Sequence, residues 1–265
     1  EIYGWRMLLT LPVMTLFLIG TKDWGLVRSI ALRLRNEWRL YLVLPASSLL
    51  LGIQLWLFLW APLHGHAMNV SLGYFMMPLV MVLIGRLYYK DKLSSLQKLA
   101  VLMAALGVIN AVFQAGGFAW TSLVVCLGYP YYFVLRSKFK IDNLGGLWFD
   151  MLLMSPLALY FALSGEGLEQ MTGLQIQLPL LILLLGVLSA SALISYILAS
   201  KMLSFSLFGL LGYVEPVLLV IVAFVIGETI AAQEWPTYLA IWLSLSVLAL
   251  EGTYKMRRQP METCP

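Results

Sequence analysis

Residues 61 to 78 read APLHGHAMNVSLGYFMMP, and residues 199 to 216 read ASKMLSFSLFGLLGYVEP. The two stretches align without a gap at an offset of 138 residues, each from an alanine that ends one apolar segment to a proline inside the next. A second ungapped pair joins RMLL at 6–9 with Pro12 to DMLL at 150–153 with Pro156. Weak symmetry between two apolar halves with matching prolines is typical of secondary transporters.

The composition is that of an integral membrane protein. Of 265 residues, 61% are hydrophobic and 11% are charged, whereas soluble domains have about 25% charged residues. The two cysteines, Cys126 and Cys264, are too few and too far apart to predict a disulfide framework or a metal site.

Nine segments of about 20 mainly apolar residues, each enough to cross roughly 30 Å of hydrocarbon, follow one another along the chain. They are predicted at residues 3–20, 41–62, 67–87, 95–113, 119–135, 144–163, 179–199, 205–226 and 235–253. The basic stretch from Lys22 to Arg39 predicts an amphipathic helix on the membrane surface, in contact with anionic lipid.

The basic residues predict the orientation of the chain. Sixteen of the seventeen Lys and Arg residues fall on alternate connections or the C-terminal tail, and only Arg6 does not. By the positive-inside rule those connections and the C-terminus are cytoplasmic. The segment 119–135 has no partner in the first half, so we expect a complete protein to have one more helix before residue 1. The predicted repeats are 1–115, with helices two to five, and 116–265, with helices six to ten and the tail.

Several motifs give the chain a family resemblance. They are SLGYFMMPLV at 71–80, LWLFLWA at 55–61, YFVLRSK at 132–138, and GYVEP at 212–216 with GET at 227–229. The chain resembles the RarD-like branch of the EamA-type drug/metabolite transporters. The resemblance implies an all-α membrane fold of two inverted five-helix repeats, with nine of the ten helices present here. It also implies a bacterial inner-membrane protein that exports small metabolites or drugs. Met77 and Asn69 depart from the polar and acidic residues expected at their positions.

Glu215 is the clearest candidate for a functional group, because it lies in the middle of an apolar segment. An ionised carboxylate at membrane depth is costly and is usually functional. One interpretation is a site that binds a proton or a cationic part of the solute in alternation. The other is a protonated side chain that hydrogen-bonds to the backbone freed by Pro216.

Other polar and aromatic residues at membrane depth are predicted to line an aromatic, weakly polar solute cavity. They are Arg6, Gln54, Trp60, Ser71, Tyr74, Tyr132, Ser195 and Tyr213. Interface anchoring, helix packing and, for Arg6, snorkelling are the structural alternatives. Gly73, Pro78, Gly209 and Pro216 form a predicted hinge, or alternatively fixed kinks. Asp150 is expected to pair with Lys138, Lys140 or Lys201.

Three classes of function remain. The first is a secondary transporter that exports a small organic solute, with protons as a candidate coupling ion. The second is an integral membrane enzyme or lipid-handling protein, although the sequence contains no catalytic triad, metal-ligand spacing or phosphate loop. The third is a partner or sensor subunit without transport. The sequence predicts no cofactor, no metal and no nucleic-acid partner, and it does not indicate an oligomeric state.

Overall fold

The computed structural model describes residues 2–117, 119–164, 177–215, 217–218, 221 and 232–258, and ten helices are defined within them. The helices are α1 (Ile2–Gly20), α2 (Trp24–Asn36), α3 (Leu40–Leu63), α4 (Ala67–Leu87), α5 (Ser95–Gln114), α6 (Trp120–Lys138), α7 (Leu144–Leu163), α9 (Gln177–Met202), α10 (Phe205–Leu211) and α12 (Trp235–Arg258). The described part of the chain is therefore helical throughout, as the sequence predicts.

Six of these helices, α1, α3, α4, α5, α7 and α9, are long and apolar enough to cross a membrane. Helices α6 and α12 coincide with two further predicted segments, and α10 with the beginning of the predicted segment 205–226. Pro216 and most of the residues after it in that segment lie outside the described residues. Helix α2 lies within the predicted amphipathic stretch, but its Val27 and Ile30 are buried in the protein and do not face lipid.

Polar side chains define where several helices begin. Ser94 and Gln97 form a reciprocal capping box at the start of α5. The Asn143 side chain accepts a 3.1 Å hydrogen bond from the Gly146 backbone N–H at the start of α7. Ser204 caps α10 by accepting from the Leu207 N–H. The apolar segments thus begin where a side chain satisfies backbone donors that have no partner within the helix.

The chain divides into two compact units. Unit 1 comprises Glu1–His64 and Tyr131–Met202, and unit 2 comprises Gly65–Pro130 and Leu203–Pro265. Within the described residues, α6 is divided between the units at Pro130 and Tyr131.

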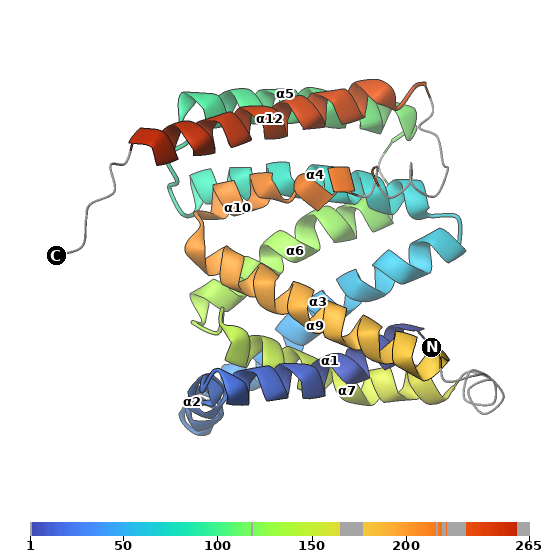
Figure 1. Ribbon diagram of the computed structural model, residues 1–265, viewed down its shortest axis with the longest axis vertical. Coiled ribbons are helices and arrows are strands. Elements are labelled where there is room, and N and C mark those ends of the chain that lie inside the picture. The colour runs from blue at the N-terminus through green and yellow to red at the C-terminus, as the bar shows by residue number, and fades with distance from the viewer. Residues whose placement is uncertain are drawn as a thin grey trace. The chain divides into compact units, whose positions relative to one another are not determined.

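In unit 1, α7 packs against α1, α2 and α3, and α1 also packs against α9 (Figure 1). A Cβ atom added at Gly4 would lie 2.5 Å from the Ala158 carbonyl oxygen, so glycine permits the close approach of α1 and α7. A cluster of buried residues joins α2, α3 and the turn before α7. Its members are Ile30, Leu40, Val43, Leu44 and Ile141.

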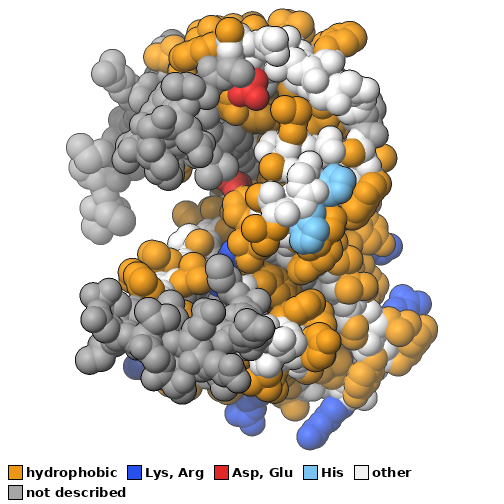
Figure 2. Space-filling view, turned by 90° about the vertical axis from the view of Figure 1, so that its right-hand side faces the viewer, with side chains coloured by type: hydrophobic (Ala, Val, Ile, Leu, Met, Phe, Trp, Pro, Cys, Tyr) orange, Lys and Arg blue, Asp and Glu red, His pale blue; other side chains and the backbone are white. Residues whose placement is uncertain are grey.

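In unit 2, α5 lies alongside α12, and α4 packs against both α10 and α5 (Figure 1). The core is made of small and branched side chains with one tyrosine, namely Val82, Ala100, Ala104, Leu210, Tyr213, Ile241 and Leu248. The Ser244 hydroxyl donates to the Ala100 carbonyl oxygen at 2.8 Å, across the α5–α12 contact. Figure 2 shows hydrophobic side chains over much of the described surface on the face that it presents, as expected for helices that face lipid.

Each unit combines helices from the two halves of the sequence. Helices α1 and α7 correspond in the internal alignment, as do α4 and α10, and α5 and α12 are the next long helices after α4 and α10. All three pairs pack against each other. The division into repeats at residue 115 stays a prediction, and the compact units have other borders.

Candidate functional sites

A network of buried polar groups surrounds Asp150 in unit 1. Its Oδ1 accepts a 2.9 Å hydrogen bond from the Ser47 hydroxyl, and its Oδ2 accepts a 3.0 Å hydrogen bond from the Tyr132 hydroxyl. Arg136 forms an ion pair with the same Oδ2, and both side chains of this pair are completely buried. The network ties α3, α6 and α7 together.

The remaining hydrogen bonds of the network reach the Tyr132 hydroxyl and two backbone carbonyl oxygens. Arg136 donates from Nη1 to the Tyr132 hydroxyl at 2.8 Å and from Nη2 to the Asn143 carbonyl oxygen at 2.8 Å. The Ser48 hydroxyl donates to the Asp150 carbonyl oxygen at 2.8 Å. A buried ion pair is stable only when such hydrogen bonds offset its loss of water. The expected pairing of Asp150 with Lys138, Lys140 or Lys201 is wrong, because the carboxylate is turned into the protein toward Arg136.

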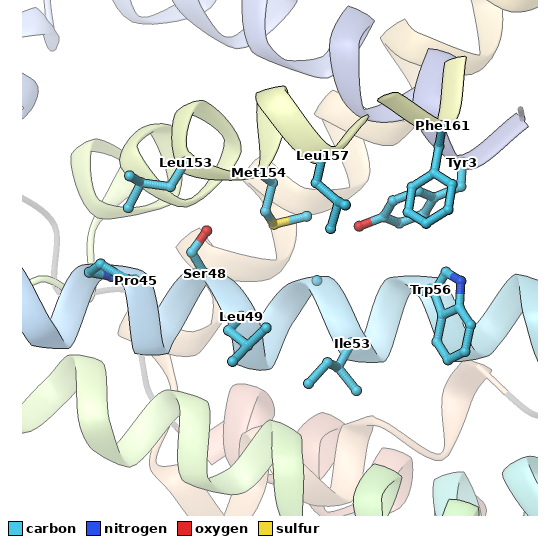
Figure 3. Close-up of a pocket in the computed structure, with 11 residues that line it drawn as sticks. Tyr3, Pro45, Ser48, Leu49, Ile53, Trp56, Leu153, Met154, Leu157 and Phe161 are labelled. Atoms are coloured by element: carbon cyan, nitrogen blue, oxygen red, sulfur yellow. The ribbon is translucent and has the colours of Figure 1, made fainter. Parts of the chain in front are cut away.

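A groove of about 350 Å³ lies beside this network, entirely within unit 1. Figure 3 shows Met154 and Leu157 of α7 reaching toward α3, from which Ser48 points back toward α7. Tyr3 and Phe161 lie together at one end, with their rings edge to face at 5.8 Å. The walls are almost entirely aliphatic and aromatic. They are formed by Tyr3, Pro45, Ser48, Leu49, Gly52, Ile53, Trp56, Leu153, Met154, Leu157 and Phe161.

Comparison with known proteins identifies the family. No family model matches the chain. It is 37% identical over 265 residues to an uncharacterized transporter of Haemophilus influenzae. This alignment covers 100% of this chain and 88% of the relative. It is 38% identical over 261 residues to the chloramphenicol-sensitive protein RarD of Pseudomonas aeruginosa. That alignment covers 98% of this chain and 87% of the relative. The chain belongs to the RarD-like transporter family. The RarD protein of Escherichia coli is a more distant relative, 25% identical over 261 residues.

Five of the predicted cavity residues of this RarD-like protein lie in unit 1. Gln54 is buried in α3, and Arg6 is half-buried in α1. Trp60 stacks on Trp56 and on His64, with ring centroids 5.1 and 4.3 Å away. Ser195 is exposed on α9. Tyr132 is buried in the Asp150 network.

The other four predicted cavity residues lie in unit 2. The buried Tyr213 hydroxyl donates a 2.9 Å hydrogen bond to the Phe75 carbonyl oxygen. Tyr74 is half-buried, with its ring 6.3 Å from that of Tyr129, and Ser71 is exposed. The Glu215 side chain is also exposed. The structure thus joins Tyr132 to a hydrogen-bond network and leaves Glu215 accessible.

The predicted hinge residues that the structure describes lie within unit 2, where they pack closely. A Cβ atom at Gly73 would lie 2.7 Å from the Val125 Cβ, and one at Gly209 would lie 2.5 Å from the Met81 Cβ. Pro78 is buried inside α4, which continues on both sides of it. Hinge movement at these positions remains a prediction.

Arg136 is the important residue of the RarD-like protein that sequence reasoning missed. It lies in the last turn of α6 beside Lys138, so it was grouped with the basic residues that determine topology. One signal was present in the sequence. An aspartate at membrane depth requires a cationic or hydrogen-bonding partner, and Arg136 is the nearest arginine along the chain.

Proposed function

We propose that this RarD-like protein is a secondary transporter that exports small organic metabolites or drugs by alternating access. The observation that carries the proposal is the packing of corresponding helices, α1 on α7, α4 on α10 and α5 on α12. Helices related by an internal repeat that pack in pairs support a duplicated transporter fold with two inverted five-helix repeats. The name of the Haemophilus influenzae relative, an uncharacterized transporter, supports a transport function.

The proposed location is the bacterial inner membrane, with the C-terminus in the cytoplasm. The distribution of Lys and Arg supports this orientation. The name of the Pseudomonas aeruginosa relative, a chloramphenicol-sensitive protein, makes chloramphenicol the first solute to test. Amino acids and nucleosides complete the panel, because a weakly polar aromatic lining suits amphipathic small molecules.

Glu215 is the proposed proton-coupling group. Its side chain is exposed, which supports a carboxylate available to a proton or to a cationic solute. We propose that proton binding at Glu215 alternates with solute binding during the cycle.

A flux assay in proteoliposomes tests this function. Radiolabelled chloramphenicol, amino acids and nucleosides are each measured with and without a pH gradient. We expect the natural chain to accumulate at least one solute in response to the gradient. Glu215→Gln should abolish the response to the gradient while solute exchange without it persists.

Asp23→Asn is the matched control, because Asp23 is an exposed acid just before α2 that makes no capping hydrogen bond. It should leave the flux unchanged. Flux of Glu215→Gln with an unaltered response to pH would remove the coupling role. Absence of flux for every solute would contradict the transporter function.

A further inference from the structure

The groove between α3 and α7 is bounded by membrane-spanning helices. Both walls belong to helices long and apolar enough to cross the bilayer. Leu49 on one wall and Leu157 on the other are 62% and 52% exposed, so the groove opens sideways to the surroundings of unit 1. At this depth the surroundings are hydrocarbon. An apolar hollow there gains dispersion contacts when a chain of methylene groups fills it.

The groove is separate from the candidate solute residue on the same helix. Gln54 is two residues from both Gly52 and Trp56, which places it on the opposite side of α3. The Gln54 side chain is buried, whereas the stripe that contains Pro45 and Leu49 is exposed. The groove is therefore distinct from the position that Gln54 occupies.

The exposed stripe of α3 continues from the groove to a basic and aromatic end. Tyr41 and Leu42 lie one turn before Pro45 and are 62% and 65% exposed. Arg39 directly precedes α3 and is exposed. Arg39 lies six positions before Pro45, about 9 Å along the helix axis. That distance places the guanidinium at headgroup level when Pro45 lies at the edge of the hydrocarbon.

Helix α2 adds further positive charge at this end of unit 1. Val27 and Ile30 are buried, so Arg28 and Arg35 project from the opposite, exposed face. The acids nearby are Glu37, Asp23 and Asp142, the last in the turn whose Lys140 carbonyl oxygen accepts from Arg33. Glu37 is paired with Arg33 through two hydrogen bonds of 2.9 and 3.0 Å. Asp23 lies at the far end of α2. The end of α2 next to α3 therefore presents an excess of arginine to the membrane surface.

We propose that the groove between α3 and α7 is a binding site for an anionic phospholipid. One acyl chain lies along Pro45, Leu49 and Ile53 against Met154 and Leu157. The phosphate group is held by Arg39 and Arg35, as juxtamembrane arginines attract anionic headgroups. The exposed Trp38, 69% accessible, lies at the interface between the two parts of the lipid.

Photo-crosslinking tests the site without reference to transport. The full chain is reconstituted in nanodiscs of phosphatidylcholine and phosphatidylglycerol, with a diazirine on the acyl chain of one lipid or the other. Labelled peptides are then mapped by mass spectrometry. We expect labelling within 45–56 and 153–161 to be about tenfold stronger from phosphatidylglycerol, because each arginine at the surface favours the anionic lipid. The double variant Arg35→Gln with Arg39→Gln should remove this preference.

Two variants fill the groove in different ways. A Cβ atom at Gly52 would meet only ordinary contacts, 3.5 Å from Met154 and 3.6 Å from the Tyr3 hydroxyl, so Gly52→Leu extends into the groove without a backbone clash. Leu49→Trp covers the opening. Both should abolish groove labelling. Leu102→Trp is the control, since Leu102 is a comparably exposed leucine, 58% accessible, on α5.

Equal groove labelling from both lipids in the natural chain would overturn the anionic site. Groove labelling that survives both Gly52→Leu and Leu49→Trp would overturn the groove as its location. Absence of groove labelling from either lipid would show that no acyl chain lies in the groove. Because none of these readouts depends on flux, failure of the lipid site is distinguishable from failure of the transport function.

Discussion

Tyr213 and Phe75 are 138 residues apart in the sequence, and the Tyr213 hydroxyl donates a 2.9 Å hydrogen bond to the Phe75 carbonyl oxygen. This separation equals the offset of the internal alignment, in which the two residues correspond. If a twofold axis relates two repeats, corresponding residues can touch only near that axis. Under the proposed inverted repeat, the axis relating α4 to α10 would pass close to this hydrogen bond, in the core of unit 2.

Replacing Tyr213 with phenylalanine should therefore destabilise unit 2. The change removes one hydrogen bond and leaves the Phe75 carbonyl without that donor, at a cost of about 0.5–1.5 kcal/mol in the free energy of unfolding. Thermal unfolding in detergent measures the effect. Tyr41→Phe is the control, because Tyr41 is 62% exposed on α3 and should show no loss. Equal stability of the two variants would contradict a structural role for the hydrogen bond.

The Arg136–Asp150 pair should behave as a single unit in a double-mutant cycle. Arg136→Gln or Asp150→Asn alone leaves a buried charge without its ionic partner, and we expect each to lower the free energy of unfolding by about 3–5 kcal/mol. The double variant should cost much less than the sum of the two. Lys138→Met, at an exposed position two residues away, is the control. Additive losses would show that the two side chains do not stabilise each other.

The elements could be predicted from sequence more completely than the contacts. Apolar length and flanking polar residues locate α4 and α7 at their observed ends, because in a membrane these two features largely determine a helix. The partner of Asp150 could not be predicted. Two nearby lysines and Arg136 are equally cationic in sequence, and only the packing of α6 on α7 selects Arg136. The groove was also missed, because Gly52 and Met154 become neighbours only through the tertiary fold.

Alanine at Gly73 should weaken the contact between α4 and the first part of α6. The new methyl group would lie 2.7 Å from the Val125 Cβ and 2.8 Å from the Ser122 carbonyl oxygen, and overpacking of this kind costs about 1–3 kcal/mol. Gly20→Ala in α1 has no neighbour within 4 Å and should be neutral or slightly stabilising. The melting temperatures of the two variants, measured side by side, decide the prediction. A stable Gly73→Ala variant would mean that α4 can move away from α6 at little cost.

The Arg33–Glu37 pair should make the end of α2 sensitive to acid. The hydrogen bond from Arg33 lowers the pKa of Glu37 below its usual value near 4.5. Because the pKa is lower in the folded state, the contribution of the pair is complete above that value and is lost as the pH falls through the lowered pKa. A spin label at position 36, in a background without Cys126 and Cys264, should therefore become mobile at low pH.

Glu37→Gln supplies the comparison for this experiment. In that variant the label should be equally mobile at every pH, because glutamine does not titrate. Arg33 keeps its hydrogen bonds to the carbonyl oxygens of Phe139 and Lys140 in both proteins. A pH response in Glu37→Gln as large as in the natural chain would assign the sensitivity to another group.

The division of the chain into units has a consequence for biosynthesis. Helix α1 packs against α7 and α9, which leave the ribosome more than a hundred residues later. Nascent α1 and α3 must therefore wait in the bilayer as independently inserted helices until their partners arrive, consistent with two-stage assembly of helical membrane proteins. Neither half of the nascent chain contains a complete core. Fragments separated at residues 115–119 should be unstable when produced singly and should recover their fold when produced together.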